Sequence, residues 1–194
     1  MQINKHLFVI AFIVGVVFIT GCNEEYIPKP RGYFRINLPK AVYKTFNPND
    51  CNFKFDIHQQ AFIIPDREGL QEPCWHNIYY PKFKSTIHLS YKTIEKNLNE
   101  MIEDSRSLVY KHTVKASDIK EFPIIDDSLK VYGLLYELEG EAASLMQFYL
   151  TDSINHFVRG ALYFNVTPNH DSLLPVSNYI KKDIEHLITT FNWK

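Results

Sequence analysis

The sequence predicts a single α+β domain with a mainly antiparallel sheet flanked by two helices. Two stretches carry apolar residues at helical spacing, whereas shorter stretches alternate apolar and polar residues as half-buried strands do. Groups of strands separated by a helix favour the α+β class over strict strand and helix alternation. The aromatic fraction of 14% and the apolar fraction of 45% favour a packed core. A chain of 194 residues suffices for one such domain and a targeting segment.

The expected strands fall into two groups. The first group comprises 51–57, 62–64, 75–80 and 86–91, and the second comprises 131–138, 144–151 and 157–166. Short turns separate the strands of the second group, which predicts an antiparallel meander. In the second of these strands, Gln147 is the one polar residue within a nearly continuous apolar run. This pattern predicts a central strand covered on both faces.

The first helix is expected at about 98–113. Asn97 and Glu100 have the spacing of a capping box, in which each side chain satisfies a backbone donor at the helix start. Apolar residues recur behind this start at helical spacing, namely Leu98, Met101, Ile102, Leu108 and Val109. We attribute this stripe to core packing, because the spacing alone explains it.

The second helix is expected after a turn at 168–171, with Asp171 or Ser172 as its N-cap. Its apolar stripe consists of Val176, Ile180, Ile184, Leu187, Ile188 and Phe191. Pro175 fits this helix only in the first turn, because proline lacks the backbone N–H that a helix interior requires.

The chain opens with the pattern of an export signal. Lys5 and His6 precede an apolar run at 7–19, which is shorter than the roughly 20 residues that cross a bilayer as a helix. Residues 18–22, Phe-Ile-Thr-Gly-Cys, resemble the lipobox of bacterial lipoproteins. We therefore expect residues 1–21 to be a signal peptide and Cys22 to be the lipidated first residue of the mature chain. The alternative is an ordinary signal anchor with a coincidental cysteine.

A lipidated Cys22 implies a place in the cell envelope. One acyl chain gives marginal membrane binding, so a diacylglyceryl group with a further palmitate-type chain is expected to hold the protein stably. The domain is then expected to face the periplasm from either the inner or the outer membrane. The formal net charge of −1 gives no electrostatic reason to expect a nucleic-acid partner.

The residues after Cys22 are expected to form a tether. Residues 22–32 include Pro28 and Pro30 and show neither helical nor strand periodicity, which favours an extended conformation. Aromatic and aliphatic residues then return, so 33–194 is expected to be the folded domain.

A basic and aromatic segment spans the end of this tether. It contains Lys29, Arg31, Tyr33 and Arg35, which are candidates for a surface that contacts a partner or the anionic membrane. The alternative is a solvated linker.

Two further cysteines, Cys51 and Cys74, lie in the expected domain. In an oxidising compartment such a pair favours a disulfide, which would stabilise the fold by about 3 kcal/mol. The alternative is two separate buried thiols. Neither cysteine has the Cys-x-x-Cys spacing of redox catalysts and zinc knuckles.

The sequence lacks the spacings that common catalytic chemistry requires. It contains no glycine-rich phosphate loop, no His-Glu-x-x-His and no Gly-x-Ser-x-Gly. We therefore expect no enzyme, no cofactor and no metal site. If a metal were bound, His76 and His88 on neighbouring strands, with Glu137 or Asp56, would be the candidate ligands.

Tyr149, Tyr163 and Arg159 are candidates for a polar and aromatic recognition surface. The alternative for these residues is ordinary packing between neighbouring strands.

Six further stretches form a recognisable set. They are 26–36, which reads Tyr-Ile-Pro-Lys-Pro-Arg-Gly-Tyr-Phe-Arg-Ile, then 74–81, 140–144, 147–153, 156–160 and the final Trp193-Lys194. Together these stretches resemble the gliding-motility lipoprotein GldD family. The resemblance covers essentially the whole mature chain. It implies an accessory role in the envelope machinery for gliding and the associated type IX secretion system, through contact with other envelope proteins.

The order of elements is similar to that of the Mog1/PsbP-like sandwich, including its terminal helix. A second reading of the function is a small-ligand-binding envelope lipoprotein with a pocket between sheet and helices. A deep apolar pocket with a few convergent polar groups would favour this reading.

Overall fold

The computed structural model describes residues 36–65, 72–166 and 170–194. All of them lie in the compact unit Arg35–Lys194. The predicted signal peptide, Cys22 and the tether lie outside the described residues. Among the described residues, no helix combines the length and the apolar character that a membrane crossing requires.

The described chain contains strands and helices in the following order. The first group is β1 (Tyr43–Phe46), β2 (Phe53–His58), β3 (Phe62–Pro65), β4 (His76–Tyr80), a 3₁₀ turn (Pro81–Phe83) and β5 (Ser85–Thr93). Helix α2 (Leu98–Tyr110) and a second 3₁₀ turn (Lys111–Val114) follow. The second group is β6 (Ala116–Asp126), β7 (Val131–Gly140), β8 (Ser144–Thr151), β9 (His156–Phe164), helix α3 (His170–Thr190) and β10 (Asn192–Trp193).

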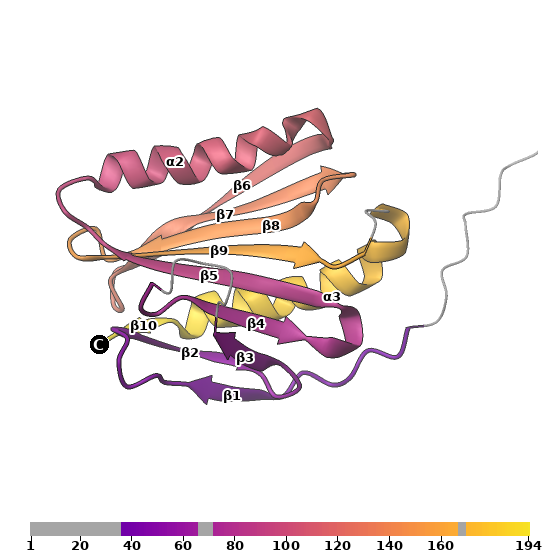
Figure 1. The fold of residues 1–194 in the computed structure, drawn as a ribbon, viewed down its shortest axis with the longest axis horizontal. Helices are drawn as coiled ribbons and strands as arrows, with labels where there is room; N and C mark the ends of the chain where they lie inside the picture. Colours follow the sequence, from indigo (N-terminus) through magenta and orange to yellow (C-terminus); the bar gives the residue numbers. More distant parts are fainter. Residues whose placement is uncertain (1–35, 66–71, 167–169) are drawn as a thin grey trace, which may run out of the picture. The chain divides into compact units, whose positions relative to one another are not determined.

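The strands form two antiparallel sheets (Figure 1). The larger sheet has seven strands in the order β3-β4-β5-β9-β8-β7-β6, and the smaller has the order β1-β2-β10. The long pairing of β5 with β9, from Ser85↔Phe164 to Thr93↔His156, joins the first group of strands to the meander β7-β8-β9. Strand β8 is therefore internal, with β7 and β9 as its neighbours.

Helices α2 and α3 cover opposite faces of the larger sheet (Figure 1). Successive strand residues point to opposite faces, and β7 illustrates the division. Leu135 packs in the cluster that contains Ile184 of α3, whereas the next residue, Tyr136, packs with Val109 of α2. The two-sided cover explains why β8 is apolar along almost its whole length.

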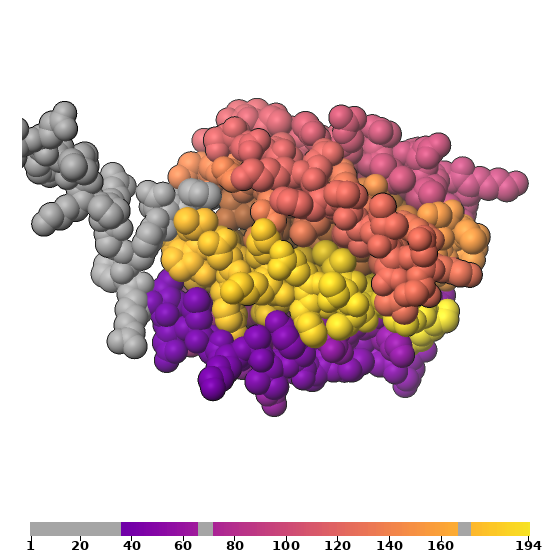
Figure 2. All heavy atoms as spheres, turned by 180° about the vertical axis from the view of Figure 1, so that it is seen from behind, coloured from indigo at the N-terminus to yellow at the C-terminus, as the bar shows by residue number. Residues whose placement is uncertain are grey.

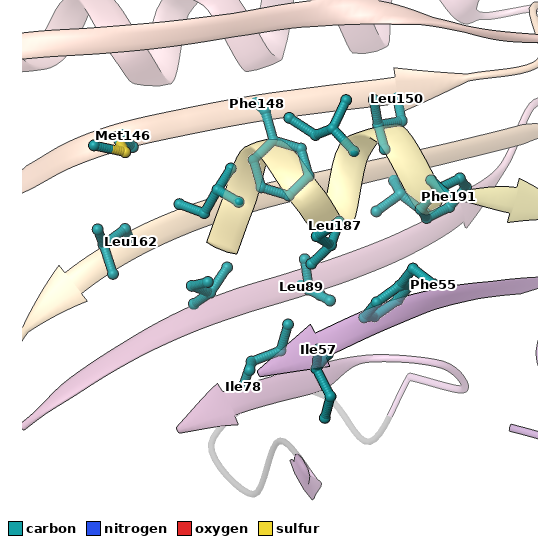
Figure 3. Packing of buried hydrophobic residues seen from close by; sticks show 14 of the residues in the cluster. Phe55, Ile57, Ile78, Leu89, Met146, Phe148, Leu150, Leu162, Leu187 and Phe191 are labelled. Atoms are coloured by element: carbon teal, nitrogen blue, oxygen red, sulfur yellow. The ribbon is translucent and has the colours of Figure 1, made fainter. Parts of the chain in front are cut away.

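The main core lies between the larger sheet, α3 and the smaller sheet. Figure 3 shows Leu187 of α3 beside Leu89 of β5 within this core. Phe53 and Phe55 of β2 each place their ring centroids 5.8 Å from that of Phe191. Apolar burial of this kind contributes about 25 cal/mol per Å², so these aromatic contacts hold the smaller sheet against α3. Seen from behind, α3 lies at the surface between the indigo strands β1 and β2 and the salmon segment around β6 and β7 (Figure 2).

The predicted strands and helices recur with small boundary changes, except at three places. Strand β6 has no counterpart in the prediction, because this edge strand is largely exposed and carries Pro123. An edge strand has one unpaired side, where proline is tolerated and no apolar alternation is needed. Strands β1 and β10 were likewise not predicted from the sequence.

The predicted helix starts need correction. Asn97 occupies the N-cap position of α2, but its side chain makes no capping hydrogen bond and instead accepts one of 2.9 Å from the backbone N–H of Glu95. Helix α3 begins at His170, so Asp171 and Ser172 lie inside it, and Pro175 falls beyond its first turn. A proline in this position lacks one helical hydrogen bond near the start of a 21-residue helix.

Candidate functional site

The residues predicted to carry the anchor and the partner surface lie outside the described residues. They are Cys22, Lys29, Arg31, Tyr33 and Arg35. Their assigned roles therefore stay predictions.

Cys51 and Cys74 lie together at the edge of the main core. Their sulfurs are bonded in the structure, and their Cα atoms are 5.6 Å apart, within the range that a disulfide spans. This geometry supports the predicted disulfide, which stays a prediction for the protein in its compartment. Both side chains are buried, so the pair is placed to join the segment before β2 to the segment before β4.

His76 and His88, the candidate ligands if a metal were bound, do not come together in the structure. His76 lies opposite Leu89, and His88 lies opposite Asn77. The two imidazoles are offset by one residue in register and point to opposite faces of the sheet. His76 packs against Phe46, whereas the ring of His88 contacts Tyr163.

The two candidate carboxylates are engaged elsewhere. Glu137 forms an ion pair with Lys181 of α3, and Asp56 lies 3.4 Å from the imidazole of His186. Within the described part of the chain, no group of three or more histidine, cysteine, aspartate or glutamate side chains has a metal-binding arrangement.

The structure brings Tyr149, Arg159 and Tyr163 onto the sheet face that α2 covers. Tyr149 of β8 lies directly opposite Arg159 of β9. Tyr163 follows four residues later on β9, so it points to the same face as Arg159. Tyr149 also stacks on Phe157, with ring centroids 5.4 Å apart. These residues form one surface with mixed polar and aromatic character.

A pocket of about 230 Å³ opens beside Arg159. Strands β5 and β9 form its floor and α2 forms one wall. It is lined by Trp75, Ser90, Lys92, Met101, Asp104, Ser105, Leu108, Phe157 and Arg159. The indole N–H of Trp75 donates a hydrogen bond of 3.0 Å to the carbonyl oxygen of Tyr91, which fixes the ring at the pocket edge.

Arg159 holds a buried donor that lacks an acceptor. Its Nη2 donates to Oε1 of Gln147, a side chain that is 1% exposed. Because a guanidinium can only donate, this bond fixes the amide orientation and leaves Gln147 Nε2 as a donor. Arg159 Nε and Gln147 Nε2 are both buried, and neither meets an acceptor among the described residues.

The charges around Arg159 are sparse. No described carboxylate forms an ion pair with it. Burial lowers the pKa of Arg159 from its ordinary value, as expected for a cation withdrawn from water. Burial, followed by the charge of Arg159, also lowers the pKa of His112, so that imidazole is neutral at pH 7.

A larger hollow of about 670 Å³ lies elsewhere, between the loop before α2 and the β8–β9 turn. Its lining includes the exposed residues Glu95, Lys96 and Ile154. It is a wide surface depression between loops. The smaller pocket beside Arg159 is the better candidate site, because it combines apolar walls with convergent polar groups.

A second polar cluster lies beside α3, around Asp183. The hydroxyl of Tyr43 donates a hydrogen bond of 3.0 Å to Asp183 Oδ1, and the hydroxyl of Tyr80 interacts with the same carboxylate. Tyr179 Oη lies 2.9 Å from His58 Nε2. The backbone N–H of Gln60 donates to Nδ1 of that histidine at 3.1 Å. In the neutral imidazole the proton therefore sits on Nε2.

The carboxylate of this cluster is buried, whereas Tyr43 and Tyr179 are half-buried. Asp183 is 4% exposed, and burial raises its pKa above the ordinary value. Burial and the charge of Asp183 raise the pKa values of Tyr43 and Tyr179 to about 12. The hydroxyl of Tyr43 therefore remains a protonated donor to the buried carboxylate, whereas the hydroxyl of Tyr179 pairs with His58. The cluster serves to fix α3 to β1 and β4.

Sequence reasoning noticed Gln147 but did not identify it as a site residue, and it missed Asp183. Asp183 lies three residues after Ile180 and one before Ile184, so it falls on the apolar stripe of α3. A charged residue at a predicted core position is the signal by which this cluster could have been found.

The comparisons with known proteins give one family and one shared fold. The solution structure of cyanobacterial PsbP (CyanoP) from Synechocystis sp. PCC 6803 is similar with a TM-score of 0.50 and 8% identity, over 83% of this chain and 98% of that chain. This likeness confirms the predicted PsbP-like α+β fold. No curated protein sequence matches the chain. A sequence model described as gliding motility lipoprotein GldD matches residues 23–193. The chain therefore belongs to the gliding motility lipoprotein GldD family.

Proposed function

We propose that this chain is a lipid-anchored accessory component of the gliding and type IX secretion machinery. It acts by contact with other envelope proteins and without catalysis of its own. The observation that carries this proposal is the family match over residues 23–193. Belonging to a gliding motility lipoprotein family supports a membrane-anchored place in the envelope.

The proposed mechanism places the folded domain on a tether. Cys22 carries the lipid, and residues 22–32 act as the spacer between the bilayer and the domain. Lys29, Arg31, Tyr33 and Arg35 supply charge and one aromatic ring for a partner near the membrane. Aromatic and arginine side chains are the types most often found at the energetic centres of protein interfaces.

Deletion of the gene in a gliding host tests the assignment to this machinery. We expect loss of spreading on agar and loss of type IX cargo from the medium, with general export unchanged. Normal spreading and normal secretion in the deletion strain would contradict the assignment.

Site-specific photo-crosslinking tests the proposed contact surface. A crosslinker at Tyr33 or Arg35 is expected to capture a defined envelope protein in living cells. The matched control position is Ile125 on β6, which is 71% exposed. Equal capture from Ile125, or none from Tyr33 and Arg35, would argue against the surface.

A second candidate function is the binding of a small ligand by the domain. The pocket beside Arg159 favours it, because apolar walls surround a guanidinium that lacks a carboxylate partner.

A further inference from the structure

We infer that the pocket between α2 and the sheet binds a small monocarboxylate with an apolar body, whose carboxylate is received by Arg159. The proposed ligand class rests on the second candidate function, the binding of a small ligand by the domain. It depends neither on the lipid anchor nor on the proposed role in gliding.

The guanidinium of Arg159 lines the pocket and forms no ion pair with a described carboxylate. A guanidinium forms its strongest contacts with planar oxygen pairs, which take two parallel hydrogen bonds. A carboxylate in the pocket would therefore offset the partly buried charge of Arg159.

The charged residues that line the pocket favour a ligand with a single negative charge. Arg159 and Lys92 contribute two positive charges, and Asp104 on α2 contributes one negative charge. The lining therefore carries a single net positive charge, which a monoanion balances. A dianion such as phosphate would be left with an excess negative charge near Asp104.

The walls of the pocket are largely apolar. Trp75, Met101, Leu108 and Phe157 line it together with the guanidinium. The volume of about 230 Å³ admits a group of the size of one substituted ring or a short aliphatic chain. An amphipathic acid fits both parts of this lining.

Gln147 acts as a positioning residue. Its Oε1 accepts from Arg159 Nη2 and so orients the guanidinium on the floor of the pocket. The amide itself is not among the residues that line the cavity. Exchange of Gln147 is therefore expected to weaken binding by letting Arg159 turn, without removing its charge.

The two tryptophans provide an internal probe and an internal control. Trp75 lines the pocket, whereas Trp193 packs on the other face of the sheet. Both indole N–H groups donate to backbone carbonyl oxygens, those of Tyr91 and Lys130.

The experiment uses the whole chain from residue 22 onward, with Cys22→Ala to avoid detergent, and phenylacetate as the probe. Phenylacetate is expected to shift the Trp75 indole resonance in a saturable manner and to leave that of Trp193 unchanged.

Three variants test the role of the charge. Arg159→Gln is expected to weaken phenylacetate binding at least about tenfold, the effect of losing hydrogen bonds to a charged group. The matched control Arg106→Gln removes an exposed arginine of α2, which pairs with Glu103 and does not line the pocket, and is expected to bind as the parent does. Asp104→Asn changes an exposed position, so it should fold normally, and it is expected to tighten binding up to about fivefold by removing repulsion.

Two further probes sharpen the result. Phenylacetamide has the same ring without the charge and is expected to bind at least about tenfold more weakly. The peptide N-acetyl-Ala-Ala-Phe carries a similar ring and carboxylate on a chain, and it is expected to bind more weakly than the free acid because the pocket is small. Tighter binding of the peptide would overturn the assignment to a small free acid.

The inference fails if Trp75 shows no saturable shift. It also fails if phenylacetamide binds as well as phenylacetate, or if Asp104→Asn leaves the affinity unchanged while Arg159→Gln folds and binds normally. None of these outcomes bears on spreading or secretion, so they are distinct from failure of the proposed function.

Discussion

The hydroxyl of Tyr43 donates a hydrogen bond of 3.0 Å to Oδ1 of Asp183, which lies 140 residues further along the chain. This bond joins the first strand of the smaller sheet to the last helix. The carboxylate is buried, so a lost donor is not replaced by water. The bond therefore contributes more to stability than an exposed bond of the same length.

Tyr43→Phe is expected to lower the free energy of unfolding by about 1–3 kcal/mol, because it leaves a buried acceptor short of a donor. Urea denaturation measures the loss. The matched control is Tyr132→Phe, which removes an exposed hydroxyl that donates to Asp127 at 3.1 Å. The control is expected to lose no more than about 0.5 kcal/mol. Equal losses in the two variants would contradict the buried role of Asp183.

Asp183 is expected to make stability depend on pH. Burial raises its pKa above the ordinary value of 3.8, so above pH 3.8 the folded state binds more protons than the unfolded state. Stability from this group is fully present below pH 3.8 and is lost as pH rises through the folded-state pKa. The Asp183→Asn variant has no carboxyl group to ionise at this position, so it does not lose stability in this way as pH rises. Relative to the parent, its unfolding free energy should therefore rise with pH from about pH 4 upward.

Asp152→Asn provides a control of opposite sign. Burial raises the pKa of Asp152, but hydrogen bonds from the backbone N–H groups of His156, Ile154 and Asn155 outweigh it and lower the pKa overall. The stabilisation is therefore present above pH 3.8 and is lost as pH falls through the folded-state pKa. The unfolding free energy of each variant should be measured against pH and compared with that of the parent. As pH rises, the difference from the parent should increase for Asp183→Asn and decrease for Asp152→Asn. Parallel curves would refute both assignments.

Gly160→Ala is expected to destabilise the domain by about 1–3 kcal/mol or more through overpacking. Gly160 on β9 lies opposite Phe148 on β8, and a Cβ atom there would meet ring carbons of Phe148. Phe148→Leu should recover part of the loss in the double variant, as measured by urea denaturation.

Gly133→Ala is the matched control for that rescue. A Cβ atom at Gly133 would meet the backbone carbonyl oxygen of Tyr149, which no change of side chain removes. Phe148→Leu should therefore give no recovery in this background. Equal recovery at both glycines would show that Phe148 is not the specific obstacle at Gly160.

The disulfide between Cys51 and Cys74 is expected to contribute about 3 kcal/mol to stability. On a Cys22→Ala background these are the two remaining cysteines of the three in the sequence. The oxidised protein should then show no free thiols after denaturation. Reduction should lower the urea midpoint of this protein and leave that of the Cys51→Ala, Cys74→Ala variant unchanged. Two titratable thiols in protein isolated from the envelope would favour the alternative of separate buried cysteines.

The sequence predicts those parts of the fold that have a periodic environment. Strand β8 was predictable because cover on both faces requires an apolar run, and α2 because its buried side recurs every three to four residues. Strand β6 was not, since an exposed edge strand imposes no pattern on its side chains. The predicted capping box of α2 is wrong because the side chain of Asn97 accepts a hydrogen bond from the backbone N–H of Glu95 and makes no capping hydrogen bond.

The candidate site was only partly predictable. Tyr149, Tyr163 and Arg159 were candidates for a shared surface, and strand register places them on one face of the sheet. The contact of Arg159 with Gln147 depends on the pairing of β8 with β9. Asp183 has its partner 140 residues away in the chain. The apolar stripe of α3 marks Asp183 as a charged residue at a core position, but its partner follows from tertiary packing and leaves no local trace in the sequence.

We propose that the domain works only when it is held at the membrane through Cys22. Spreading of a gene-deletion strain that expresses either the parent chain or its Cys22→Ala variant tests this directly, with equal amounts verified by immunoblot. The parent chain is expected in the membrane fraction and is expected to restore spreading. The Cys22→Ala variant is expected to leave the membrane fraction and to fail to restore spreading. Full restoration by a soluble Cys22→Ala protein would show that the anchor is not required.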